Sequence, residues 1–146
     1  MSHYEKIWWL ADGKLGGMPK PPVEDIAQLK ASGLGAIASF LEGRDNLAEY
    51  EEHGIEYFWS PVVDDEAPSL EQVKDFINFV DQTLEDGLSL AVHCKGGNGR
   101  AGTMLAAYYI SKGKSAEEVL QFMRAINPRA VATKTQEEFL SQLVFD

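Results

Sequence analysis

HCKGGNGRAGT, residues 93–103, joins an apolar run of strand length (LSLAV, 88–92) to an apolar run with helical character (MLAAYYI, 104–110). This order predicts a strand, a tight loop and a helix. The glycines let successive backbone N–H groups turn toward one point, and the N-terminus of the following helix adds partial positive charge there. The stretch is therefore expected to bind an anion such as phosphate or sulfate.

Cys94 and Arg100 lie at the two ends of this loop. An anion cradle favours the thiolate form of a cysteine at its start, and the thiolate is the nucleophile. An arginine in the first helical turn can offer a planar fork of donors to two oxygens of one phosphate. A buried structural cysteine needs no such arginine. The combination predicts a catalytic site in which Arg100 binds the substrate together with Lys95, Gly96, Gly97, Asn98 and Gly99.

The Cys-x5-Arg spacing with a preceding histidine resembles the signature of the cysteine-dependent protein tyrosine phosphatases. It is most similar to the small, atypical dual-specificity phosphatases and their archaeal-type relatives. Three further segments are similar to segments in the same order in that family: LGGMPKPP (15–22), SPVVDDEAPSLEQ (60–72) and NPRAVATKTQEEF (127–139). The resemblance covers nearly the whole chain. It implies hydrolysis of phosphotyrosine, and of phosphoserine or phosphothreonine, through a phosphocysteine intermediate on Cys94.

Strand and helix patterns alternate along residues 1–146, which predicts one α/β domain. A hairpin is expected over Asp12-Gly13, and Ser69 and Ser115 each begin a capping-box pattern. Phe139 to Val144 mark a last helix. We expect a central, mostly parallel sheet of four to five strands flanked by helices, and the resemblance implies the phosphatase fold. Further strands are expected at 35–41, 55–59 and 88–92.

Phosphoryl transfer also needs an acid for the leaving group, and the Cys94 loop holds none. Asp64, Asp65 and Glu66 follow the 55–59 strand. Without the Cys94 loop they would be read as a solvated acidic turn. The distance in sequence from Gln72 back to Asp64 is similar to that in the family, so the resemblance implies that Asp64 is the general acid and base. Asp65 is the alternative.

Three residues are assigned supporting roles. Strand alternation points the His93 side chain away from Cys94, and the resemblance implies that it orients the loop backbone. Gln136 matches a position where the family often has a polar residue near the pocket, which would help to place the hydrolytic water; a surface helix glutamine is the alternative. Glu42 matches an acidic residue near the pocket, or it belongs to a solvated turn.

Composition limits the partners of this chain. Its formal net charge of −10 argues against binding to nucleic acid or to an anionic membrane. The single cysteine excludes an intramolecular disulfide, and no signal-like segment or apolar run of membrane-spanning length is present, so a cytoplasmic location is expected. The chain is also expected to be a monomer. We expect no cofactor and no metal. The expected partner is a phosphorylated protein or peptide.

Other functions are compatible with the same loop. Lys95 also occurs in the HCK of inositol-lipid phosphatases, so a phosphoinositide or another small phosphomonoester is an alternative substrate. A phosphopeptide-binding module without catalysis would be expected to lack Cys94, Arg100 or Asp64, and all three are present. Arsenate reductases need resolving cysteines, which this chain lacks. A sulfurtransferase is a further alternative. It would load sulfur from thiosulfate, and failure to release sulfur that cyanide can trap would exclude it.

Ala101 departs from the family pattern, in which Ser or Thr at this position donates a hydrogen bond to the sulfur. We expect slow breakdown of the phosphocysteine, because the departing thiolate lacks this donor. Ala101→Ser should raise turnover by roughly 10- to 100-fold, since a hydrogen bond to a charged group contributes about 1.5–3 kcal/mol, and it should speed alkylation of Cys94 at acidic pH. Unchanged turnover and unchanged alkylation would contradict this account.

Overall fold

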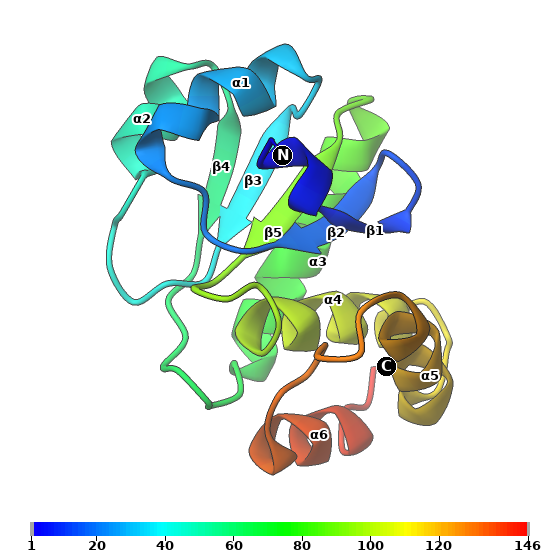
Figure 1. The fold of residues 1–146 in the computed structure, drawn as a ribbon. Coiled ribbons are helices and arrows are strands. Elements are labelled where there is room, and N and C mark those ends of the chain that lie inside the picture. Colours follow the sequence, from blue (N-terminus) through cyan, green and yellow to red (C-terminus); the bar gives the residue numbers. More distant parts are fainter. Residues whose placement is uncertain (1, 146) are drawn as a thin grey trace.

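Five strands form one mixed sheet in the computed structural model, which describes residues 2–145 (Figure 1). The strand order is β1-β2-β5-β3-β4. The hairpin of β1 and β2 is antiparallel, and the pairs β2–β5, β5–β3 and β3–β4 are parallel. The strands are β1 Trp8–Ala11, β2 Leu15–Met18, β3 Ala36–Ser39, β4 Glu56–Trp59 and β5 Leu90–His93.

Residues 2–145 also contain six α-helices and two short 3-10 turns, and α4, α5 and α6 all follow the last strand. The helices are α1 Ile26–Ala31, α2 Leu47–Glu52, α3 Leu70–Glu85, α4 Arg100–Ser111, α5 Ala116–Ile126 and α6 Lys134–Ser141. The 3-10 turns are η1 Tyr4–Lys6 and η2 Val23–Asp25. The expected capping boxes at Ser69 and Ser115 are present, and Thr133 with Gln136 forms a third. The last helix ends at Ser141, so the expectation that it continues to Val144 is wrong.

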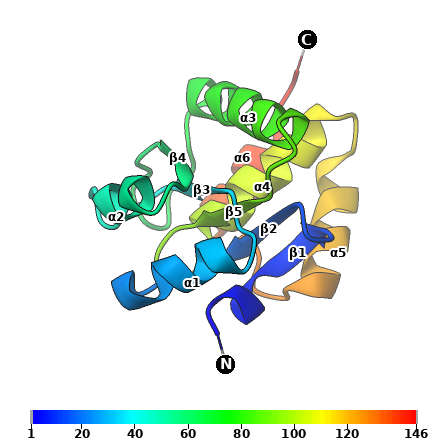
Figure 2. The same cartoon turned by 90° about the horizontal axis from the view of Figure 1, so that it is seen from above.

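The helices cover both faces of the sheet (Figure 2). Alternate strand residues point to opposite faces: Ala36, Ala38, Leu90 and Val92 pack with α3, α4 and α5, whereas Ile37 and Ala91 pack with α1 and α2. This arrangement confirms the predicted α/β sheet flanked by helices. None of the helices within residues 2–145 is long and apolar enough to span a bilayer.

Parallel strands place their carboxyl ends at one edge of a sheet, where ligands bind in open α/β folds. His93 at the end of β5 lies between Met18 of β2 and Ser39 of β3, and Ser39 pairs with Trp59 of β4. The segments after these four strands therefore meet at one edge. They contain Pro19–Pro22, Phe40–Asn46, Ser60–Ser69 and Cys94–Gly99.

Candidate active site

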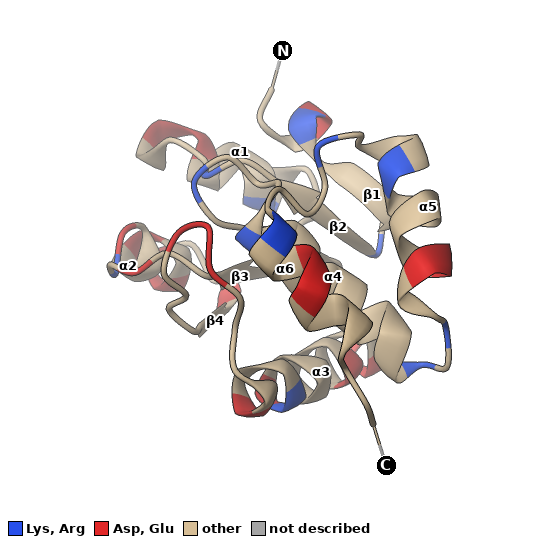
Figure 3. Ribbon diagram, turned by 90° about the horizontal axis from the view of Figure 1, so that it is seen from below, with Lys and Arg blue, Asp and Glu red and all other residues tan. Residues whose placement is uncertain are grey.

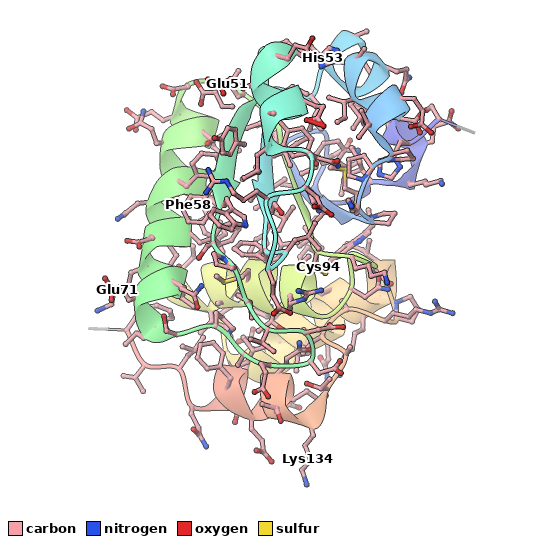
Figure 4. All side chains as sticks on the ribbon, turned by 90° about the vertical axis from the view of Figure 1, so that its left-hand side faces the viewer. Glu51, His53, Phe58, Glu71, Cys94 and Lys134 are labelled. Atoms are coloured by element: carbon pink, nitrogen blue, oxygen red, sulfur yellow. The ribbon has the colours of Figure 1, made fainter. Side chains whose placement is uncertain are left out.

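Cys94 begins the loop between β5 and α4, which we call the phosphate loop (residues 94–99). Its side chain is buried, and it lies where the strand ends approach α4 (Figure 4). Among the hydrogen bonds of residues 2–145, none uses the backbone N–H of Lys95, Gly96, Gly97, Asn98 or Gly99 as a donor. Free N–H groups in a loop before a helix N-terminus are the donors that an oxyanion needs.

Two neighbouring segments hold the phosphate loop. On one side, the N–H of Lys20 donates to the carbonyl of Lys95 at 3.0 Å, and Gly97 lies so close that a Cβ there would collide with the carbonyl of Met18. On the other side, the N–H of Val131 donates to the carbonyl of Asn98 at 3.0 Å, and Asn127 Nδ2 donates to Asn98 Oδ1 at 2.9 Å. These contacts fix the loop from outside and leave its N–H groups unused.

Arg100 is a buried cation at the first position of α4. Its Nη1 donates to the carbonyl of Val62 at 2.9 Å, and its Nη2 lies 3.5 Å from Asp64 Oδ1. Its Nε is buried and has no hydrogen-bond partner among the described residues. A buried N–H of this kind is costly unless a ligand satisfies it, so the guanidinium fits an oxyanion in the phosphate loop.

Asp64 lies in the loop between β4 and α3, which we call the acidic loop (residues 60–69); its Asp and Glu residues are red in Figure 3. Its Oδ1 accepts a hydrogen bond from the N–H of Asp65 at 3.0 Å, and its own N–H lies 3.4 Å from Glu42 Oε1. The Asp64 side chain is 69% exposed, so it is accessible to a substrate while it contacts Arg100. Asp65 adopts a positive φ of 67°, and the structure pairs Arg100 with Asp64 rather than with Asp65.

His93 is buried behind the phosphate loop. Its Nδ1 donates to the carbonyl of Cys94 at 3.0 Å, so its Nε2 accepts from the Tyr50 hydroxyl at 2.8 Å. Asn46 Nδ2 donates to the Tyr50 oxygen at 3.2 Å and to the carbonyl of Pro21 at 2.9 Å. Burial lowers the pKa of His93 to about 4 and raises the pKa of Tyr50. The neutral imidazole therefore fixes the backbone of Cys94.

Gln136 is buried at the third position of α6. Its Oε1 accepts from the N–H groups of Ala132 and Thr133 at 3.0 and 3.1 Å, and its Nε2 donates to the carbonyl of Glu66 at 3.1 Å. A Cβ built on Gly99 would be 3.3 Å from the Gln136 amide, so this amide lies directly against the phosphate loop. The surface-helix alternative for Gln136 is wrong, and its role with the hydrolytic water stays a prediction.

Ala101 is fully buried in the same core cluster as Cys94. The nearby hydroxyl of Thr103 donates to the carbonyl of Gly99 at 2.7 Å and is therefore engaged with the loop backbone. Within residues 2–145, no cluster of three or more His, Cys, Asp or Glu side chains could hold a metal.

Several residues that contact the site were not predicted from the sequence. Tyr50 is a single aromatic residue in an amphipathic helix, and Thr133 is an ordinary helix cap, so neither has a distinctive sequence signal. The carbonyl of Val62 binds Arg100 through the backbone and has none at all. The Thr133–Gln136 capping box was readable from the sequence, and it would have placed Gln136 at a helix start beside the acidic loop.

The buried His93 makes stability depend on pH. The unfolded imidazole titrates near pH 6.5, whereas burial lowers the folded pKa to about 4. Between these values the unfolded chain binds more protons, so stability falls as the pH falls. The free energy of unfolding, measured with urea, should drop by about 2 kcal/mol from pH 7 to pH 5 through His93. This drop should shrink in His93→Gln, and an equal drop in both proteins would contradict the assignment.

Comparison with known proteins identifies the family. Residues 13–114 match the family described as "Polymorphic toxin system, DSP-PTPase phosphatase". The tyrosine-protein phosphatase CDC14 homolog of Schizosaccharomyces pombe is 39% identical over 88 residues, which are 60% of this chain and 16% of that protein. The phosphatidylglycerophosphate phosphatase PTPMT1 of Arabidopsis thaliana is 28% identical over 137 residues, which are 88% of this chain and 40% of that protein. The chain thus spans less than half the length of either relative.

The fold agrees with this family. The crystal structure of Tk-PTP in the active form has a TM-score of 0.86 and 28% sequence identity, and the match covers 97% of this chain and 99% of that chain. The matched residues 13–114 include the phosphate loop and the acidic loop. The chain therefore belongs to the family of DSP-PTPase phosphatases.

Proposed function

We propose that this enzyme hydrolyses phosphotyrosine, phosphoserine and phosphothreonine in proteins through a phosphocysteine intermediate. The observation that carries the proposal is the phosphate loop, which begins at the buried Cys94 and is followed by Arg100; its backbone N–H groups and the Nε of Arg100 have no hydrogen-bond partner among residues 2–145. These donors suit the equatorial oxygens of a phosphoryl group in transfer. Asp64 Oδ1, 3.5 Å from Arg100 Nη2, is at the edge of the same cradle.

In the first step, the Cys94 thiolate attacks phosphorus and the bond between phosphorus and the leaving oxygen breaks. The carboxylic acid of Asp64 donates its proton to that oxygen, so the alcohol or phenol leaves neutral. The loop N–H groups and Arg100 stabilise the charge on the three equatorial oxygens. His93 contributes through the carbonyl of Cys94, which holds the nucleophile in place.

In the second step, water attacks the phosphocysteine and gives one proton to the Asp64 carboxylate. The bond between phosphorus and sulfur breaks, orthophosphate leaves, and the thiolate is restored. Ala101 supplies no hydroxyl to this leaving thiolate, so we expect this step to limit turnover.

A lipid phosphate is the second candidate substrate. It is favoured by the similarity to a plant enzyme named phosphatidylglycerophosphate phosphatase, which extends over 88% of this chain. The net charge of −10 and the exposed carboxylates of the acidic loop argue for a peptide instead, because an anionic lipid surface would repel them.

Phosphate release from a matched pair of peptides, one phosphotyrosyl and one phosphothreonyl, tests the proposal. Micellar phosphatidylglycerophosphate is the third substrate, and Cys94→Ser is the blank. Comparable release from both peptides is the expected result. Release from the lipid alone would overturn the peptide assignment, and equal release by wild type and Cys94→Ser would overturn the mechanism.

Asp64→Asn tests the general acid. Turnover on the phosphotyrosyl peptide should fall by about 100- to 10,000-fold, which is the usual contribution of such a residue. Inhibition by vanadate should change little, because the oxyanion binds to the loop and Arg100. Asp65→Asn is the matched control, since asparagine tolerates the positive φ at this position. A loss in Asp65→Asn without one in Asp64→Asn would make Asp65 the acid.

A further inference from the structure

The N-terminus of α6 is hydrogen bonded to the acidic loop. The hydroxyl of Thr133 donates to the carbonyl of Asp65 at 3.0 Å, and Gln136 Nε2 donates to the carbonyl of Glu66 at 3.1 Å. These two carbonyls directly follow Asp64 in the chain. Two donors from one rigid helical turn therefore hold the backbone that carries the candidate acid.

The same helical turn also lies against the phosphate loop. The Gln136 side chain is 1% exposed, and its amide contacts Gly99, where a Cβ would be only 3.3 Å away. Its Oε1 is fixed by the N–H groups of Ala132 and Thr133, which orients Nε2 toward Glu66. One side chain thus spans the gap between the loop that binds phosphate and the loop that carries Asp64.

Apart from Arg100, which donates to the carbonyl of Val62 at 2.9 Å and lies 3.5 Å from Asp64 Oδ1, the acidic loop has few other anchors near Asp64. The N–H of Glu66 donates to the carbonyl of Val63 at 3.0 Å, which only closes a turn within the loop. The contact of Asp64 N–H with Glu42 is long, at 3.4 Å, and Asp65 has a strained φ of 67°. A loop with exposed side chains and internal strain keeps one conformation only when its surroundings hold it.

We propose that Thr133 and Gln136 are positioning residues for the general acid, and that they form a clamp which holds Asp64 over the phosphate loop. This inference rests on the proposed function, because it assigns the clamp to the protonation of the leaving group. Both Oε1 and Nε2 of Gln136 form their hydrogen bonds with backbone groups of the protein. The clamp is therefore a role distinct from placing the hydrolytic water.

Two substitutions remove the clamp and keep the helix cap. Gln136→Glu retains an oxygen for the N–H groups of Ala132 and Thr133 but loses the donor to Glu66. Thr133→Asp retains a good N-cap acceptor but loses the donor to Asp65. Thr133→Ser keeps the hydroxyl and is the conservative variant that should restore activity. Ser115→Asp makes the same change at the N-cap of α5 and serves as the matched control.

The readout is kcat/KM on two substrates that differ in their need for an acid. A phosphotyrosyl peptide needs protonation of its leaving phenol, whereas 2,4-dinitrophenyl phosphate leaves as a stable phenolate. In Gln136→Glu and Thr133→Asp, kcat/KM on the peptide should fall about 10- to 100-fold more than on the dinitrophenyl ester, since a small displacement of a catalytic group has this effect. Ser115→Asp and Thr133→Ser should match wild type on both.

A second comparison uses the acid itself. In the Asp64→Asn background the two clamp variants should cause no further loss on the peptide, because residues that act as one unit are not additive. Equal losses on both substrates, or full additivity with Asp64→Asn, would overturn the clamp and leave the proposed function intact. Absence of release from either substrate by the wild-type enzyme would instead overturn the proposed function, and the clamp with it.

Discussion

The site depends on one property of the phosphate loop: its carbonyl groups form hydrogen bonds with the protein, whereas, within residues 2–145, its N–H groups do not. A loop can aim its N–H groups at an anion only if something else holds it in place, because free N–H groups contribute no internal support. Here its carbonyl groups accept hydrogen bonds from the neighbouring strand, helix and loops, and the donors include His93, Lys20, Val131, Gly102 and Thr103. The carbonyls of Cys94, Lys95, Asn98 and Gly99 are thus bonded to protein groups, whereas the N–H groups of residues 95–99 have no partner among residues 2–145. The phosphate loop is thus held by β5, by α4, by the segment after β2 and by the segment before α6.

The buried guanidinium of Arg100 is likewise held by some of its donors and leaves another donor unused. Burying a guanidinium is unfavourable unless its donors are satisfied. The carbonyl of Val62 and the carboxylate of Asp64 use two of its nitrogens, and Nε is buried without a partner in the described part of the chain. Val62 and Asp64 belong to the acidic loop, so Arg100, the proposed phosphate ligand, also contacts the loop that carries the proposed acid. In the proposed mechanism, placement of the acid and binding of the anion are therefore coupled through one side chain.

The sequence predicted those features of the fold and site that depend on a local residue pattern. The hairpin, the capping boxes at Ser69 and Ser115, and the phosphate loop between β5 and α4 follow from glycines, caps and periodicity. Contacts between distant segments have no such signature. Tyr50 reaches His93 across 43 positions of sequence, and Gln136 reaches Glu66 across 70, so only the packed fold brings them together. Carbonyl partners such as Val62 carry no side-chain signal at all.

Backbone strain shows which parts of the site are held by their surroundings. Asn46, Asp65 and Val131 are the non-glycine residues with positive φ among residues 2–145, and each lies beside the site. Val131 is the most costly, because a β-branched side chain disfavours this region. Arg124 donates to the carbonyls of Ala130 and Val131 at 2.9 and 2.8 Å, and these bonds offset the strain. The strained geometry turns the Val131 N–H toward the carbonyl of Asn98, so strain in one loop orders the next.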